Sequence, residues 1–273
     1  LVSDDVVHSF ALVKSDIEPV DVLPGNPIDL RLSFDQPGTY TFSCTRWCGE
    51  DHWRMRGTIV VTGDEQANME MPDQPLYLQL GIDLDAPHKL HDLNIKAQPS
   101  ADNGAVLDVA LPTDLLTLDY YRSHSPVQTW EHLKSEPATS DLSDAQVWDF
   151  VARIWEQRIN PDKLAEAASL YQRDCAACHG ADGKGDGVFG VKESSGDDNR
   201  HGAAPDGHSR KAPTNFADPN HMLTLSPAFI QGKIIRGGMG TGMPSWGLIY
   251  TEEQTWALVN YIWTFVFNFS FEE

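Results

Sequence analysis

The stretch "SCTRWCGEDHWRMRG" at residues 43–57 decides how the first part of this chain folds. It leaves one predicted strand, runs into another, and holds Cys44, Cys48, His52 and Met55 in a C-x3-C-x3-H-x2-M pattern. Two thiolates, an imidazole and a thioether are ligands that suit copper and disfavour magnesium or calcium. A disulfide would explain only the cysteines, and a thioether is a poor ligand for zinc. The pattern therefore predicts a copper site on a loop between strands.

The residues around this loop, 1–63, predict β structure. "PIDLRLSF" (27–34) alternates apolar and polar residues, "TYTFSC" (39–44) does the same, and "GTIVVTG" (57–63) closes the segment. A small antiparallel barrel or sandwich accommodates such strands. Two thiolates this close can bridge two copper ions, a cluster that needs a second imidazole. His8 in "DDVVHSF" can supply it, although His8 can also be an ordinary strand histidine.

A second motif, "CAACH" at 175–179, has the C-x-x-C-H spacing of a covalent attachment site for c-type haem. Cys175 and Cys178 would form the thioethers and His179 would be an axial ligand. A helix is predicted to begin at Asn160-Pro161, with Asn as N-cap and Pro at the first helical position, and to run into Cys175. A thioredoxin-like cysteine pair is the alternative, but it needs a βαβ context that the surrounding sequence does not indicate.

A haem in such a site needs a sixth ligand, and "GGMGTGMPSWG" (237–247) offers Met239 and Met243. We expect Met243, because a proline follows it directly. A Met/His ligand pair raises the haem potential, as suits an electron carrier.

Between these two parts, residues 64–160 carry seventeen acidic against six basic side chains, and they predict an acidic linker with no assigned chemistry. Within it, "QPLYLQLGIDL" (74–84) can form a strand. "LSDAQVWDFVARIW" (142–155) aligns with "YTEEQTWALVNYIW" (250–263), and both open with the spacing of a capping box. The two segments are either similar amphipathic helices or traces of a degenerate copy of the C-terminal domain.

The totals of the chain restrict its class. A formal charge of −20 over 273 residues excludes the basic face that nucleic acids require and favours a basic protein partner or a salty habitat. No run of 18 or more apolar residues is present. Because "LVSDDVVHSF" opens like the interior of a strand, we expect the natural N-terminus, with a signal or membrane anchor, to lie upstream of residue 1.

With these motifs in place, "VVHSFAL" and "PGNPIDLRLSFDQPGTYTFSCTRWCGEDHWRMRGTIVV" resemble the dinuclear copper (CuA) cupredoxin domain of cytochrome c oxidase subunit II and nitrous oxide reductase. The resemblance covers nearly all of 1–63 and implies a Greek-key β-sandwich or barrel. It implies that the ligands are the bridging Cys44 and Cys48, the capping His8 and His52, the weak axial Met55 and the backbone carbonyl of Arg46. Oxidase subunit II normally has Glu in the place of Arg46, where the carboxylate helps to hold a non-redox metal.

The segment around "CAACH" and "MPSWG" resembles an all-α class I cytochrome c over residues 161–271. By this resemblance the ligands of the haem are Cys175, Cys178, His179 and Met243. The predicted organisation is a CuA cupredoxin domain at 1–63, an acidic mixed linker at 64–160, for which a degenerate cytochrome-like segment is the alternative, and a class I cytochrome c domain at 161–273.

The two resemblances imply an electron-transfer subunit that relays single electrons between haem c and CuA into a haem–copper respiratory complex of the cytochrome oxidase or nitric oxide reductase type. The subunit would not be catalytic alone. The alternatives are a module for nitrous oxide reduction and a free periplasmic relay protein. Expected partners are a membrane haem–copper catalytic subunit and a soluble donor, either cytochrome c or a small copper protein. The expected location is the periplasm or the extracytoplasmic face of the membrane.

Overall fold

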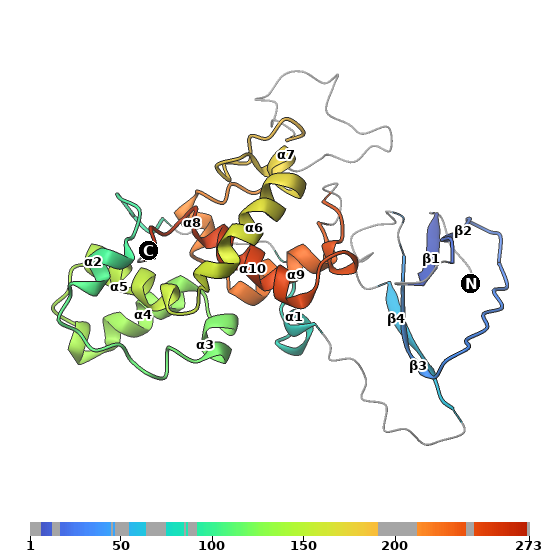
Figure 1. Ribbon diagram of the computed structural model, residues 1–273, viewed down its shortest axis with the longest axis horizontal. Coiled ribbons are helices and arrows are strands. Elements are labelled where there is room, and N and C mark those ends of the chain that lie inside the picture. The colour runs from blue at the N-terminus through green and yellow to red at the C-terminus, as the bar shows by residue number, and fades with distance from the viewer. Residues whose placement is uncertain are drawn as a thin grey trace.

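The computed structural model describes residues 7–12, 17–44, 46, 55–63, 75–84, 86, 92–190, 212–238 and 243–271. Strands lie towards one end of the view in Figure 1 and helices towards the other. The strands are β1 (His8–Leu12), β2 (Val20–Val22), β3 (Gly38–Ser43) and β4 (Arg56–Val61).

These four strands form one antiparallel sheet in the order β2-β1-β3-β4. The β3–β4 pairing runs from Gly38 opposite Val61 to Ser43 opposite Arg56. The strands predicted at 39–44 and 57–63 are thus confirmed within a residue or two. Because β1 pairs with both β2 and β3, the start of the described chain is held beside the end of β3, where Cys44 follows. Closure into a Greek-key barrel stays a prediction.

The strand predicted over 27–34 is wrong. Ile28, Leu30, Leu32 and Phe34 are half-buried and the residues between them are exposed, so the alternation is real, but no strand forms there among the described residues. Alternation reports which side chains face a core, whereas a strand also needs a neighbour to receive its backbone hydrogen bonds. Phe34 packs on Tyr40 of β3 through its ring, at 4.4 Å between centroids, rather than through a backbone ladder.

The rest of the described chain is helical. Its α-helices are α1 (Leu76–Gln79), α2 (Ala101–Ala105), α3 (Leu118–Ser123), α4 (Pro126–Ser135), α5 (Asp144–Glu156), α6 (Pro161–Asp174), α7 (Ala176–His179), α8 (Pro219–Met222), α9 (Pro227–Arg236) and α10 (Glu252–Trp263). Two 3₁₀ turns, η2 (Pro137–Thr139) and η3 (Trp246–Leu248), lie between them. None of the described helices is long and apolar enough to cross a membrane.

The helix-start signals in the sequence are confirmed. Ser143 and Gln146 form a reciprocal capping box at α5, and Thr251 and Gln254 form the same box at α10. The side chain of Asn160 accepts a hydrogen bond from the N–H of Asp162 at the start of α6. Each cap satisfies backbone donors that the first turn of a helix leaves without partners.

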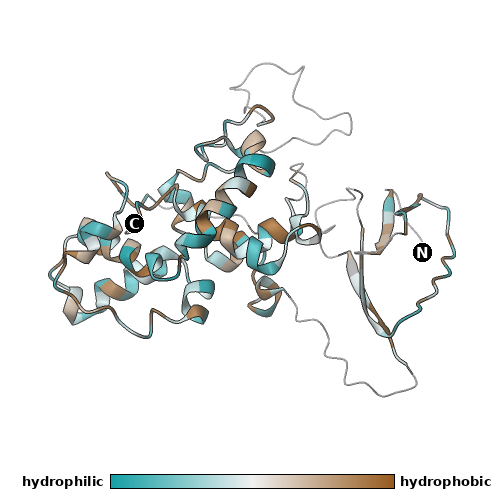
Figure 2. Ribbon diagram, viewed as in Figure 1, coloured by the Kyte–Doolittle hydropathy of each residue, from teal (hydrophilic) through white to brown (hydrophobic). Residues whose placement is uncertain are grey.

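A single buried cluster joins the helices. Trp155 of α5 and Trp263 of α10, which correspond in the sequence alignment of the two helices, meet edge to face with 6.4 Å between ring centroids. Figure 2 shows apolar and polar residues alternating around individual helices, as amphipathic packing requires. Residues from the expected linker, such as Tyr77 and Leu133, belong to the same cluster as the C-terminal helices. The domain boundaries at 63 and 160 stay predictions.

The segment 74–84, considered a strand, contains helix α1 instead. Tyr77 is fully buried there, and α1 approaches α9 at Gly232. A Cβ at Gly232 would lie 2.9 Å from Leu84 and 3.0 Å from Tyr77, so only glycine permits this approach. Packing against α9 therefore decides the conformation of a segment whose local pattern is ambiguous.

Candidate functional site

The "CAACH" motif forms one helical turn at the end of α6. Cys175 ends α6 and precedes α7, and its carbonyl accepts the backbone N–H of His179 at 2.9 Å. Cys178 and His179 then stand three and four residues after Cys175, a spacing that places side chains on one face of a helix. The predicted position of the motif at a helix end is confirmed, and the geometry suits three side chains that face one planar group.

His179 is held in a defined tautomer. Its Nδ1 lies 3.1 Å from the carbonyl oxygen of Thr214, which can only accept, so Nδ1 carries the proton. Burial keeps the pKa of His179 below its usual value, and the hydrogen bond to Thr214 opposes this shift only in part. The ring stacks on Phe216 with 4.4 Å between centroids. A neutral, oriented imidazole with its lone pair on Nε2 is what an axial iron ligand requires.

The two thiols of the motif do not resemble a reactive redox pair. Burial, followed by the charges of Asp174 and Cys178, raises the pKa of Cys175 to about 12. Reactive cysteines in C-x-x-C motifs have a lowered pKa, because the thiolate is the nucleophile. Neither Cys175 nor Cys178 is in a disulfide. The site therefore favours covalent attachment of a cofactor over thiol–disulfide exchange.

A glycine-rich loop, residues 180–190, covers the backbone of the motif. The N–H of Gly185 donates to the carbonyl of His179 at 2.7 Å, and the N–H of Phe189 donates to that of Ala177 at 2.8 Å. Gly187 donates to the carbonyl of Cys178 at 3.1 Å, and a Cβ on it would approach the carbonyl oxygen of Ala176 to 2.6 Å. The loop thus fixes the motif from outside and needs a residue without a side chain at 187.

Met243 lies on the loop after α9. It is partly buried and packs against the same cluster as Cys175 and Phe216. Its carbonyl accepts the N–H of Gly238 at 3.1 Å, which closes a turn over residues 238–243. The alternative ligand, Met239, lies outside the described residues.

On the β side, the structure brings together the ends of the copper loop. Cys44 directly follows β3, Met55 directly precedes β4, and the N–H of Cys44 donates to the carbonyl of Met55 at 2.8 Å. Cys44 is buried with 8% of its surface exposed, whereas Met55 is 40% exposed. The hairpin register therefore places these two predicted ligands side by side.

Strand β1 completes this arrangement. The backbone N–H of Ser9 donates to the Sγ of Cys44 at 3.3 Å, and the carbonyl oxygen of Arg46 lies 3.3 Å from the same sulfur. The Nδ1 of His8 is buried and has no hydrogen-bond partner among the described residues. Buried polar atoms normally have partners, and a metal ion would satisfy this one. A thiol, a carbonyl and an orphaned imidazole nitrogen fit a copper ion.

The structure does not assemble the complete predicted set. Cys48 and His52 lie outside the described residues, and within the described parts no group of three or more His, Cys, Asp or Glu residues is placed to hold a metal. Of the predicted copper ligands, His8, Cys44, Arg46 and Met55 are described. The ligand roles of all these residues therefore stay predictions.

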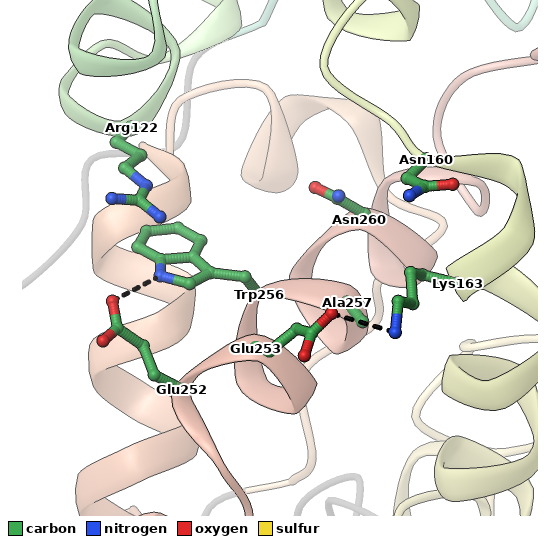
Figure 3. Close-up of a pocket in the computed structure, with 8 residues that line it drawn as sticks. All are labelled: Arg122, Asn160, Lys163, Glu252, Glu253, Trp256, Ala257 and Asn260. Carbon is green, nitrogen blue, oxygen red and sulfur yellow. Dashed lines mark hydrogen bonds and ion pairs between the residues drawn. The ribbon is translucent and has the colours of Figure 1, made fainter.

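A groove that sequence reasoning missed lies between α3, the start of α6 and α10 (Figure 3). Its volume is about 430 Å³, and the guanidinium of Arg122 lies 4.2 Å above the ring of Trp256 at one side. Lys163 and Glu253 pair across it at 2.9 Å. None of the predicted ligands lines the groove, and no sequence motif marks it, because its residues come from three separate helices.

Comparisons with known proteins agree with both halves of this picture. The cytochrome c family model matches residues 164–265. Cytochrome c oxidase subunit 2 of Thermus thermophilus is 43% identical over 61 residues, which is 22% of this chain and 44% of that protein. Subunit 2 from a second, named strain of Thermus thermophilus is also 43% identical over 61 residues, which is 22% of this chain and 36% of that protein. A probable cytochrome c oxidase subunit 2 of Streptomyces avermitilis is 30% identical over 99 residues, 34% of this chain and 31% of that protein.

The chain thus spans less than half the length of each of these relatives. Among solved structures, a chain of the reducing HAO-like protein complex of Kuenenia stuttgartiensis aligns with 52% of this chain and 72% of its own length, at 18% identity and a TM-score of 0.33. That similarity is too low to support an inference. Residues 164–265 therefore form a domain of the cytochrome c family, and the similarity to cytochrome c oxidase subunit 2 supports a CuA cupredoxin-like domain in the same chain.

Proposed function

We propose that this chain is an electron-transfer subunit that relays single electrons between a covalently attached haem c and a dinuclear copper centre, and that it serves a haem–copper oxidase. The observation that carries the proposal is the pairing of two prepared donor sets in one polypeptide. One is the oriented, neutral His179 beside two buried thiols. The other is the buried sulfur of Cys44, in contact with the Arg46 carbonyl.

The haem side of the proposal rests on the turn that holds "CAACH". Cys175 and Cys178 would attach the porphyrin, His179 would bind the iron through Nε2, and Met243 would take the opposite axial position. Thr214 and Phe216 fix the imidazole ring, and burial of the site excludes water. A bound haem with His and Met ligands supplies reversible one-electron chemistry at a raised potential.

The copper side rests on the junction of β1, β3 and β4. Cys44 and Cys48 would bridge two copper ions, and His8 and His52 would each bind one. Met55 and the Arg46 carbonyl would be the weaker ligands. The N–H of Ser9 donates to the Cys44 sulfur at 3.3 Å, and hydrogen bonds to a copper-bound sulfur tune the potential of such a site.

Covalent linkage of the two centres gives the relay its physical advantage. Two separate carriers must meet by diffusion, whereas two domains on one chain remain at a high effective concentration. The catalytic step would lie in a membrane haem–copper subunit that binds this chain. We place both centres on the extracytoplasmic side, as for the subunit 2 relatives, with a soluble cytochrome or a small copper protein as donor.

A second candidate is a module that serves nitrous oxide reduction, and Arg46 favours it. Oxidase subunit II has a glutamate here that holds a metal against its catalytic partner. In this chain the residue is an arginine, and its side chain pairs with Asp21 of the same chain. The position therefore offers no carboxylate to a partner.

The proposal is tested by purifying the native protein from its own membranes in mild detergent, followed by metal analysis and electron paramagnetic resonance. We expect two coppers and one haem for each chain, together with an integral haem–copper subunit. Recovery as a soluble protein with both centres would instead support a free relay. A preparation with haem and no copper would refute the relay.

A matched pair of variants tests the ligand roles. Cys48→Ser is expected to abolish the mixed-valence copper signal while haem stays attached, because the bridge between the ions is lost. Ser43→Ala, at the neighbouring end of β3, is expected to keep both. A mixed-valence signal that survives in Cys48→Ser would exclude the bridging role.

A further inference from the structure

The side chain of Arg46 is held by a two-point ion pair. Its Nε donates to Oδ1 of Asp21 at 2.8 Å, and its Nη2 donates to Oδ2 at 2.9 Å. Such parallel bonds fix the orientation of both planar groups, which a single contact between point charges does not. The pairing holds the pKa of the Asp21 carboxyl below its usual value, chiefly through the hydrogen bond from Arg46. Asp21 is therefore ionised at neutral pH.

This ion pair closes a circuit of contacts around the Cys44 sulfur. Asp21 lies on β2 and pairs directly with Ser9 of β1. The N–H of Ser9 donates to the Sγ of Cys44 at 3.3 Å, and the carbonyl of Arg46 lies 3.3 Å from the same atom. The guanidinium of Arg46 then returns to Asp21. The β1–β2 pair thus grips the copper loop at two points, one at the sulfur and one two residues later.

The consequence concerns the backbone of Arg46 rather than its side chain. A loop residue with a mobile side chain can rotate its peptide plane, and its carbonyl would then turn away from the sulfur. Fixing the guanidinium to a strand restricts that rotation. Asp21 has no ligand atom in the predicted set, and it lies 25 residues before Arg46 in the sequence.

We propose that Asp21 is a positioning residue for the copper site, which keeps the carbonyl of Arg46 directed at the Cys44 sulfur through the two-point ion pair. The inference rests on the proposed copper function and adds a residue outside the ligand set. It also gives Arg46 a role in this chain that a glutamate at that position could not have, since two carboxylates would repel.

The position of the pair on the surface defines what Asp21 can affect. The side chains of Arg46 and Asp21 are 58% and 39% exposed. Exposed ion pairs add little to global stability, so loss of this one should leave the sheet folded. Its effect should appear at the copper ions. Loss of an outer partner of a metal ligand typically weakens metal affinity roughly 10- to 100-fold, and because this pair is exposed we expect at most about tenfold.

The experiment uses the whole protein loaded with copper and haem, and compares four variants with the wild type. Asp21→Asn removes the charge and keeps the shape, and Arg46→Lys keeps the charge and removes the fork. The double variant Asp21→Arg with Arg46→Asp restores the pair in reverse. Asp29→Asn is the matched control, because it removes an exposed carboxylate from the same part of the chain.

The readouts are copper content, the copper hyperfine pattern and visible bands of the mixed-valence form, and the rate of copper loss to a chelator. We expect Asp21→Asn to keep two coppers, to shift the hyperfine pattern and bands, and to lose copper up to about tenfold faster. Arg46→Lys should shift the same features less. The reversed pair should restore the wild-type pattern, and Asp29→Asn should match the wild type. The haem spectrum of each variant should be unchanged.

Two results would overturn the inference. An Asp21→Asn protein with two coppers and a wild-type spectrum and release rate would show that the ion pair does not position the carbonyl. A reversed pair that folds, as judged by circular dichroism, but keeps the shifted spectrum of Asp21→Asn would show the same. A wild type that binds no copper would overturn the proposed function itself, which is a separate outcome.

Discussion

Replacing Trp155 by alanine should destabilise the haem-binding part of the chain, although Trp155 lies in the segment 64–160 that the sequence marks as a linker. The side chain is 1% exposed. Its ring meets Tyr121 at 5.8 Å and both Trp263 and Phe267 at 6.4 Å between centroids. Removal of the indole would leave a cavity where α5 meets the C-terminal helices.

The magnitude follows from this burial. Truncation of a buried tryptophan to alanine costs about 3–5 kcal/mol in the free energy of unfolding. For a unit of roughly 200 residues, each kcal/mol lowers the Tm by about 2–4 °C. We therefore expect the Tm of the haem-binding part to fall by about 6–20 °C. The copper-binding sheet should unfold as in the wild type, because no ring contact joins Trp155 to its described residues.

The assay is thermal unfolding of the whole protein, followed at the haem absorption band and, separately, at the copper signal. Val106→Ala is the matched control, because Val106 lies in the same segment and is 82% exposed. Its effect should stay within about 0.5 kcal/mol. A Trp155→Ala protein whose haem transition moves no more than that of Val106→Ala would refute the shared core and restore the linker interpretation.

Three further predictions concern the haem domain. Met243→His should lower the haem potential and shift the visible spectrum, because imidazole replaces a thioether as ligand; an unchanged spectrum would move the sixth ligand to Met239. Gly187→Ala should reduce the fraction of protein that carries haem, since its Cβ would lie 2.6 Å from the carbonyl oxygen of Ala176; Gly38→Ala, which makes only an ordinary contact at 3.5 Å, is the control, and equal haem loading of the two would contradict the tight loop. Burial holds the pKa of His221 below its usual 6.5, against a smaller opposing effect of Asp218. The unfolded state therefore takes up a proton first, and stability should fall as the pH drops below 6.5 towards the folded pKa. Urea unfolding above and below that pH should show a flatter dependence for His221→Gln than for the wild type, and identical slopes would exclude this contribution.

Local chemistry in the sequence was sufficient for several features of the fold. Capping boxes at Ser143 and Thr251 predict the starts of α5 and α10, because those side chains satisfy backbone donors within three residues. The position of "CAACH" at a helix end follows from the Asn160-Pro161 start and the length of the run after it. The β3–β4 hairpin follows from alternation on both sides of the cysteine loop.

Other features depend on partners far away in the sequence. The segments 27–34 and 74–84 have strand-like patterns, yet one lacks a pairing neighbour among the described residues and the other is packed as a helix against Gly232. The carbonyl that orients His179 belongs to Thr214, 35 residues away. No local pattern contains these contacts, because they depend on which surfaces meet when the chain collapses.

The sequence by itself determined the ligand types, their spacing and the class of each cofactor, because these depend on the chemistry of neighbouring residues. The tertiary structure alone decided which groups surround them. It placed the Ser9 N–H on the Cys44 sulfur and Asp21 on Arg46, and it set Trp155 against Trp263 so that the expected linker shares the helical core. Spacing along a chain records which atoms can bind, whereas packing in three dimensions determines what holds those atoms in place.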